Sequence, residues 1–89
     1  MTQATDITRK RLLWRATHRG IKEMDILVGG YAEAQVGTMD EAALATFAGL
    51  LELPDQELLA WATGIEPIPP QHDCAMLRAI LAFRPAIDA

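Results

Sequence analysis

The chain has 89 residues, the size of one small domain, so we expect residues 1–89 to form a single domain without room for a second core. Apolar residues make up 51% of the chain and charged residues 22%, which is typical of a globular protein and excludes a disordered one. The single cysteine, Cys74, excludes an internal disulfide, and no apolar run approaches the roughly 18 residues of a membrane span.

The net charge of −4 is unevenly distributed along the chain. Residues 1–22 hold six basic residues against one acidic residue, a net charge of +5, and residues 23–89 hold two against eleven, a net charge of −9. The basic stretch predicts either a charged docking surface or a solvated helix face, whereas the acidic remainder argues against a general nucleic-acid binder. The N-terminus lacks the apolar core of a signal peptide, and a basic mitochondrial presequence would have to end inside a predicted helix. We therefore expect a cytoplasmic protein of bacterial type.

Hydrophobic periodicity predicts two helices in the first half of the chain. The first runs from about Asp6 to His18, with Thr5 or Asp6 as its N-cap. Gly20 follows the last turn, where helices commonly end in a left-handed conformation. The second helix covers about residues 21–36 and contains Gly29-Gly30, a pair that costs it roughly 1 kcal/mol per glycine relative to alanine. The pair predicts either a kink or the close approach of another backbone.

Sequence punctuation predicts three further helices. Residues 38–41 have the pattern of a capping box, in which the Thr38 hydroxyl and the Glu41 carboxylate would each accept from the other's backbone amide. Three prolines in four positions make residues 65–71 an extended connector. The three helices are predicted over about residues 38–52, 54–64 and 73–84. No segment alternates with period two, so we expect an all-α fold, a small single-domain bundle of about five short helices.

The residue types that usually carry catalysis or bind metals are sparse in this chain. There is no serine, and the only histidines are His18 and His72. His72 lies two residues from Cys74, so the two side chains would point away from each other on a helix. His72-Asp73-Cys74 supplies three kinds of metal ligand, but no second cluster completes a tetrahedral site. No glycine-rich phosphate loop follows a strand. We therefore expect no catalytic residue, no metal and no stably bound cofactor.

The segment from His18 to Asp25 is the best candidate for a docking site. Gly20 would allow a tight corner between two helices and leave its backbone bare for a partner. Arg19 would present a planar fork that suits a carboxylate or a carbonyl. Glu23 would lie in the first turn of the next helix, where the helix dipole favours a carboxylate. Ordinary helix caps and an intramolecular ion pair would explain the same residues equally well.

A helix-turn-helix reader of DNA is an alternative on fold grounds, because a basic first helix and a short glycine turn are compatible with it. The second helix carries Glu23, Asp25 and Glu33, however, and phosphates would be repelled by these carboxylates. A protein-interaction module of another kind is the further alternative.

The ordered motifs of the chain resemble those of the succinate dehydrogenase assembly factor 2 family, the SdhE-type FAD assembly factors or flavinators. Arg19-Gly20-Ile21-Lys22-Glu23 has the family's Arg-Gly-x-x-Glu signature. The other matching stretches lie at residues 11–15, 23–27, 38–41 and 50–61. The resemblance covers about residues 8–84, and His18 departs from the basic residue that precedes the signature in many members.

The resemblance implies an assembly factor that binds the flavoprotein subunit of succinate dehydrogenase and promotes the covalent attachment of FAD to one of its histidines. The flavoprotein of fumarate reductase would be a second client. In this family the bond formation is attributed largely to the flavoprotein, so the resemblance implies a chaperone that is not an enzyme, and FAD as the partner's cofactor. The partner-binding residues it implies are Arg19, Gly20 and Glu23, with Asp25, His18 and Arg15 as companions.

Overall fold

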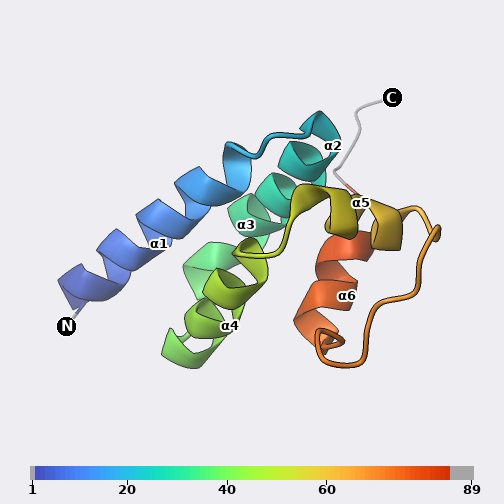
Figure 1. Ribbon diagram of the computed structural model, residues 1–89. Helices are drawn as coiled ribbons and strands as arrows, with labels where there is room; N and C mark the ends of the chain where they lie inside the picture. Colours follow the sequence, from blue (N-terminus) through green and yellow to red (C-terminus); the bar gives the residue numbers. More distant parts are fainter. Residues whose placement is uncertain (1, 85–89) are drawn as a thin grey trace.

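The structure, a computed structural model, describes residues 2–84, with side chains from residue 5 onward. Its elements in chain order are α1 (Thr2–Thr17), α2 (Lys22–Met24), the π-helical turn η1 (Asp25–Gly29), α3 (Gly30–Gln35), the 3-10 turn η2 (Val36–Thr38), α4 (Glu41–Leu51), α5 (Asp55–Ala62) and α6 (Ala75–Ala82) (Figure 1). Because α2 to η2 follow one another without interruption, the described residues form five helical segments and no strand. The predicted all-α class is confirmed.

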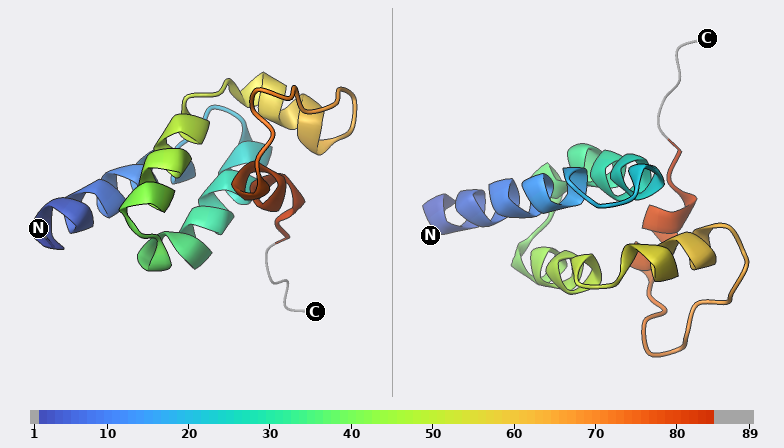
Figure 2. Two further views of the ribbon diagram at one scale, coloured as in Figure 1. Left: turned by 90° about the horizontal axis from the view of Figure 1, so that it is seen from below. Right: turned by 45° about the horizontal axis from the view of Figure 1, so that its top comes forward.

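The helical run from α2 to α3 turns back along α1, and the two lie side by side and antiparallel (Figures 1 and 2). α1 packs against η1, α3 and α4, while α6 packs against η1, α4 and α5. The π-helical turn therefore lies at the centre of the molecule, in contact with both the first and the last helix. Within residues 2–84, no helix is long and apolar enough to cross a membrane.

One apolar cluster drawn from every α-helix and both short turns forms the core. Its largest fully buried side chains are Phe47, Met24, Leu77, Ile80 and Val28. Burying a side chain of this size stabilises a fold by about 1.5–3 kcal/mol, so these five residues account for a large part of the stability of a chain this short.

Gly29 and Gly30 allow two helices to approach the π-helical turn closely. A Cβ atom on Gly29 would lie 3.1 Å from the carbonyl oxygen of Ala16 and from Cγ2 of Thr17, near the end of α1. A Cβ atom on Gly30 would lie 2.6 Å from the ring of Phe83, just after α6. At Gly29 the neighbour is the backbone of α1, which is one of the two predicted explanations, whereas at Gly30 the neighbour is the Phe83 side chain.

Four local predictions differ from the structure. α1 begins at Thr2, ahead of the predicted Thr5 or Asp6 cap, because nothing in residues 2–5 interrupts a helix. The capping box at residues 38–41 does not form, because η2 extends to Thr38 and the Thr38 hydroxyl donates to the Gln35 carbonyl at 2.9 Å. Asp40 caps α4 instead, accepting from the Ala43 amide at 2.8 Å.

The third difference concerns Gly20, whose φ is not positive. Gly64 has the only positive φ (80°) among residues 2–84, and it ends α5 near the predicted position. α6 is also shorter than predicted, beginning after an N-cap at Cys74 and ending at Ala82. The helix ends there because the next residue, Phe83, already has an extended backbone (φ −61°, ψ 136°).

Candidate functional site

Arg19 lies between α1 and α2, and its side chain turns inward, where only 10% of it is exposed. Nε donates to Oδ1 of Asp55 at 2.6 Å, Nη1 to the carbonyl of Leu51 at 2.8 Å, and Nη2 to the carbonyl of Leu53 at 2.9 Å. The last carbonyls of a helix lack intrahelical donors, so the guanidinium satisfies groups that α4 leaves unpaired. Arg19 thereby ties the α1–α2 corner to the α4–α5 connection.

Two carboxylates hold the backbone of the same corner. Asp25 Oδ1 accepts from the amide of Arg19 at 2.5 Å, and Asp55 Oδ2 accepts from the amide of Gly20 at 2.9 Å. Asp55 therefore binds both the Arg19 side chain and the Gly20 backbone, and its side chain is only 17% exposed. We name these four residues, Arg19, Gly20, Asp25 and Asp55, the corner clasp.

Gly20 is exposed at the tip of the corner clasp, and nothing inside the chain requires a glycine there. Its φ is not positive. A Cβ atom at this position would meet only Oδ2 of Asp55, at 3.6 Å, which is ordinary van der Waals contact. The absence of a side chain therefore has no packing role in the described residues, and its consequence is a bare backbone facing outward.

Glu23, one turn beyond the corner, is exposed and makes no hydrogen bond or ion pair with any described residue. It borders an open hollow of about 250 Å³ whose floor is apolar, formed in part by Ile26, Leu27 and Leu59. An unpaired carboxylate beside apolar surface is suited to binding a cationic group that comes with an apolar neighbour.

An aromatic pair flanks the corner on α1. Trp14 is 62% exposed, and the His18 ring stacks on it with centroids 4.1 Å apart and planes 12° apart. His18 Nδ1 lies 2.7 Å from the carbonyl oxygen of Trp14, and because a carbonyl only accepts, this nitrogen carries the proton. Nearby on α1, Arg15 forms an exposed ion pair with Glu52. The stacked pair presents a rigid aromatic surface of the kind enriched in binding hot spots.

Residues 10–84 match the model of a protein family described as the flavinator of succinate dehydrogenase. The chain belongs to this family. It is 44% identical over 73 residues to the FAD assembly factor SdhE of Acetobacter pasteurianus, covering 82% of this chain and 67% of that protein. It is 38% identical over 83 residues to the mitochondrial succinate dehydrogenase assembly factor 2 of Danio rerio, covering 91% and 52%. With the corresponding protein of Yarrowia lipolytica the identity is 35% over 68 residues, covering 76% and 47%.

The predicted resemblance to flavinators is thus confirmed. The chain spans about half the length of the mitochondrial relatives that it matches.

The six residues predicted as partner-binding fall into three groups in this flavinator-family chain. Gly20, Glu23 and His18 are exposed. Arg19 and Asp25 belong to the corner clasp, where the Arg19 side chain donates to Asp55 and the Arg19 amide donates to Asp25. Arg15 is paired with Glu52 on the surface. The structure therefore brings all six residues to one end of α1, but it uses Arg19 and Asp25 to hold the corner in place.

Two residues of this site were missed in the sequence analysis. Asp55 lies in the helix predicted over about residues 54–64 and was given no role in the site, although its carboxylate is the acceptor that joins the Arg19 side chain to the Gly20 backbone. Trp14 lies in the stretch of residues 11–15 that matches the family's motifs, and it was given no role of its own. Its position in the sequence indicates an exposed tryptophan near the signature, because it lies on the helix face opposite the buried Leu12 and Ala16.

The weak metal candidate, His72-Asp73-Cys74, is used for local structure. Asp73 accepts two hydrogen bonds from Arg78, both at 2.7 Å, and these lower the pKa of the Asp73 carboxyl below its ordinary value. Cys74 caps α6 through its sulfur, and the His72 ring lies against Trp61. In the described part of the chain no three His, Cys, Asp or Glu side chains converge on a position where a metal ion could bind.

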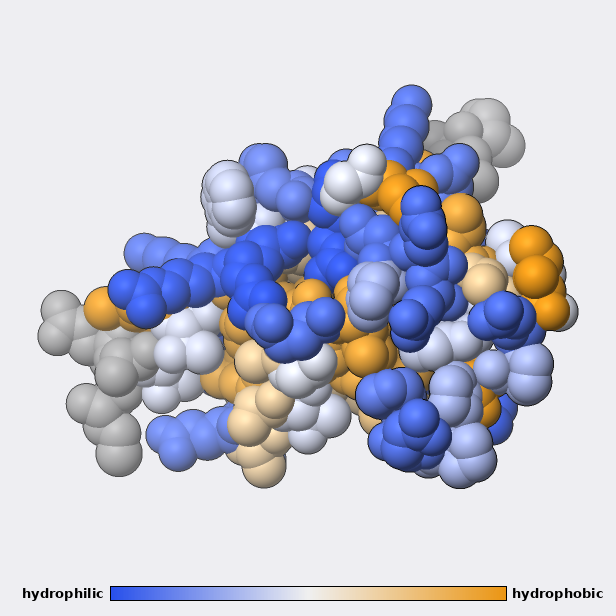
Figure 3. Space-filling view, in the orientation of Figure 1, coloured by the Kyte–Doolittle hydropathy of each residue, from blue (hydrophilic) through white to orange (hydrophobic). Residues whose placement is uncertain are grey.

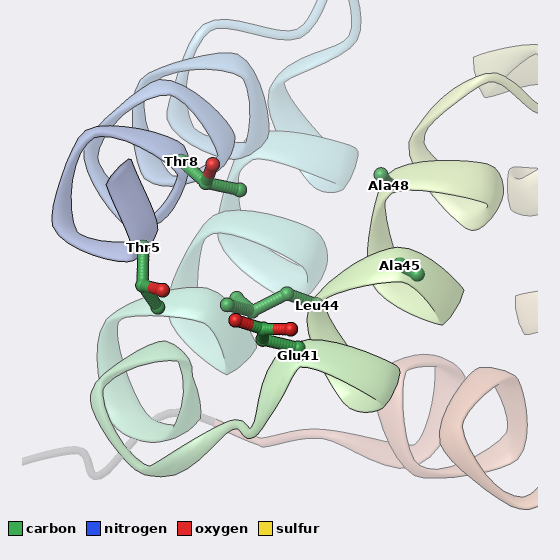
Figure 4. Close-up of a pocket in the computed structure, with 6 residues that line it drawn as sticks. All are labelled: Thr5, Thr8, Glu41, Leu44, Ala45 and Ala48. Carbon is green, nitrogen blue, oxygen red and sulfur yellow. The ribbon is translucent and has the colours of Figure 1, made fainter. Parts of the chain in front are cut away.

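A separate hollow of about 290 Å³ lies between α1 and α4, away from the corner clasp. Figure 4 shows Thr5 and Thr8 of α1 facing α4 across this hollow, with Leu44 and Glu41 on the opposite side. Thr8 precedes the end of α1 by two and a half turns, about 14 Å along the helix axis. This hollow is therefore not part of the flavinator signature.

Proposed function

We propose that this chain is an assembly factor that binds the flavoprotein subunit of succinate dehydrogenase and promotes the covalent attachment of FAD to that subunit. Membership of the flavinator family supports this proposal, as does the name of the Acetobacter pasteurianus relative, an FAD assembly factor. The observation that carries it is Gly20, a glycine without a conformational or packing role among the described residues, exposed next to Glu23, whose carboxylate no described residue pairs with.

The corner would dock as a preformed surface. The corner clasp fixes the backbone on either side of Gly20 before a partner arrives, so little conformational entropy is lost on binding. The bare backbone at Gly20 can then lie flush against the partner, while Glu23 supplies a carboxylate for a charge-assisted hydrogen bond. Arg19 and Asp25 act in this scheme as positioning residues, which keep the corner in shape and contact the partner little.

The bond-forming groups would belong to the flavoprotein. In this chain Cys74 and His72 are engaged in capping and ring packing, and His18 is stacked on Trp14. Binding would favour the flavoprotein conformation in which FAD and its histidine are correctly placed, which is a shift of population and of orientation. FAD remains the partner's cofactor, and the fumarate reductase flavoprotein is a second proposed client. The proposed location is the cytoplasm, as for a protein similar to a bacterial relative.

Expression of the flavoprotein subunit with and without this chain tests the proposal. Covalently bound FAD survives denaturing electrophoresis and fluoresces in the gel. We expect the fluorescence per unit of flavoprotein to rise several-fold when the chain is present, and the two proteins to purify together. Equal fluorescence in the two samples, or retention of the chain on DNA at moderate salt without capture of the flavoprotein, would overturn the proposal in favour of a regulatory module.

A further inference from the structure

The geometry points to a second contact of this chain with its partner, in a groove formed by α2, η1, α5 and α6. We propose that this groove holds an extended segment of the flavoprotein that has apolar residues at its centre, a basic residue facing Glu23 and an acidic residue facing Arg84. This inference rests on the proposed function. Helices α2, α5 and α6 and the turn η1 meet at the end of the molecule farthest from the N-terminus (Figures 1 and 2).

The groove consists of two adjoining hollows, of about 250 and 410 Å³, that have Ala62, Leu81 and Arg84 in common. The smaller hollow is lined mainly by apolar surface, with Ile26 44% exposed beside it, whereas the larger hollow also has Arg78 in its wall. Figure 3 shows one face of the molecule, where hydrophilic residues cover most of α1 and apolar residues come to the surface below it and at the edge farthest from the N-terminus. An extended segment places alternate side chains on one side, about 6.5–7 Å apart, which suits two adjoining hollows.

The charges at the groove specify the segment further. Glu23 and Arg84 border the same hollow, yet they do not form an ion pair with each other. Nη1 of Arg84 donates to the carbonyls of Phe83 and Leu81, at 2.8 and 3.5 Å, and no described carboxylate pairs with its guanidinium. Among the residues that the structure describes, the carboxylate of Glu23 and the guanidinium of Arg84 thus have no charged partner, and a partner segment with the opposite order of charges would pair with both.

The groove is continuous with the docking corner, because Glu23 belongs to the signature and borders the groove. A partner seated on Gly20 would therefore extend over the groove without a gap. The corner alone is a small contact, whereas specific interfaces bury about 800 Å² per partner. The groove adds the apolar area that the charged corner lacks.

Titration calorimetry with the full chain and the purified flavoprotein subunit tests the groove. The variants are Ile26→Asp and Arg84→Glu, with Ile7→Asp and Lys10→Glu as matched controls. Ile7 is 47% exposed, close to the 44% of Ile26, and lies near the start of α1. We expect Ile26→Asp and Arg84→Glu each to weaken binding at least tenfold and each control to weaken it less than threefold.

The result that overturns the groove is wild-type affinity in both groove variants while Gly20→Leu still weakens binding. Failure of the wild-type chain to bind the flavoprotein at all would overturn the proposed function instead, so the two failures are distinguishable. If sedimentation shows that Ile26→Asp separates a dimer of this chain without changing its affinity for the flavoprotein, the groove is a self-interface and the proposal is wrong.

Discussion

Replacing Asp55 with alanine should destabilise the whole domain, because this carboxylate accepts hydrogen bonds from two parts of the corner. The variant loses the 2.6 Å bond from Arg19 Nε and the 2.9 Å bond from the Gly20 amide. It also leaves the Arg19 guanidinium without its counter-ion, in a side chain of which only 10% is exposed. The remaining bonds of Arg19 to the carbonyls of Leu51 and Leu53 cannot neutralise its charge.

The expected loss of stability is about 3 kcal/mol. Hydrogen bonds to charged groups contribute about 1.5–3 kcal/mol each, and breaking a fully buried ion pair costs about 3–5 kcal/mol. Because both side chains of this pair are partly exposed, we take the lower end of the second range. A chain of 89 residues is stable by about 4–13 kcal/mol in total. The melting temperature should therefore fall by about 12–24 °C.

Urea unfolding followed by circular dichroism measures this loss, with Glu52→Ala as the matched control. The control removes the ion pair between Arg15 of α1 and Glu52 just after α4, which is exposed on both sides (41% and 71%) and should contribute less than about 1 kcal/mol. Equal unfolding midpoints for Asp55→Ala and Glu52→Ala would refute the reasoning, because they would show that the corner clasp contributes no more than a surface ion pair.

Three further predictions follow from single contacts. Trp14→Ala should weaken binding to the flavoprotein about tenfold in titration calorimetry, because aromatic residues are enriched among those that dominate binding energy. Its free energy of unfolding should stay within about 0.5 kcal/mol of the wild type. Unchanged affinity would show that Trp14 is not part of the docking surface. Gly30→Ala should lower the melting temperature, because the added Cβ would lie 2.6 Å from the Phe83 ring, and a rise would contradict the packing. NMR titration should give Asp73 a pKa below its ordinary 3.8, and Arg78→Ala should restore it. The Asp73–Arg78 ion pair therefore stabilises the folded state at pH values above the ordinary pKa of Asp73. This stabilisation is lost as the pH falls through the lowered pKa of the folded state.

The helical class and the proline-rich connector follow from local sequence signals, whereas the glycine pair Gly29-Gly30 left open whether it marks a kink or the close approach of another backbone. The N-cap of α4 shows where such signals fail. Thr38 and Asp40 both have side chains that cap helices, and the choice fell to Asp40 because the preceding 3-10 turn already uses the Thr38 hydroxyl. A sequence pattern cannot rank two such caps without knowing where the previous helix ends.

The candidate site shows a different limit. The sequence placed Arg19, Gly20 and Glu23 in one motif, but it left open whether Arg19 binds a partner or its own chain. The answer depends on the carbonyls of Leu51 and Leu53, more than thirty residues away, and no local spacing indicates them. Only the fold shows that Arg19 holds the corner and that Gly20 and Glu23 remain free at its surface.

The central claim is that the bare corner at Gly20 docks the flavoprotein, and the most direct test compares two glycine variants in the covalent-FAD assay. Gly20→Leu and Gly49→Leu both add a bulky side chain at an exposed position, where a Cβ atom meets either one ordinary contact or open space. Both should fold with wild-type helix content. We predict that Gly20→Leu reduces covalent FAD on the flavoprotein at least tenfold, while Gly49→Leu leaves it unchanged. Full flavinylation with Gly20→Leu would contradict the account.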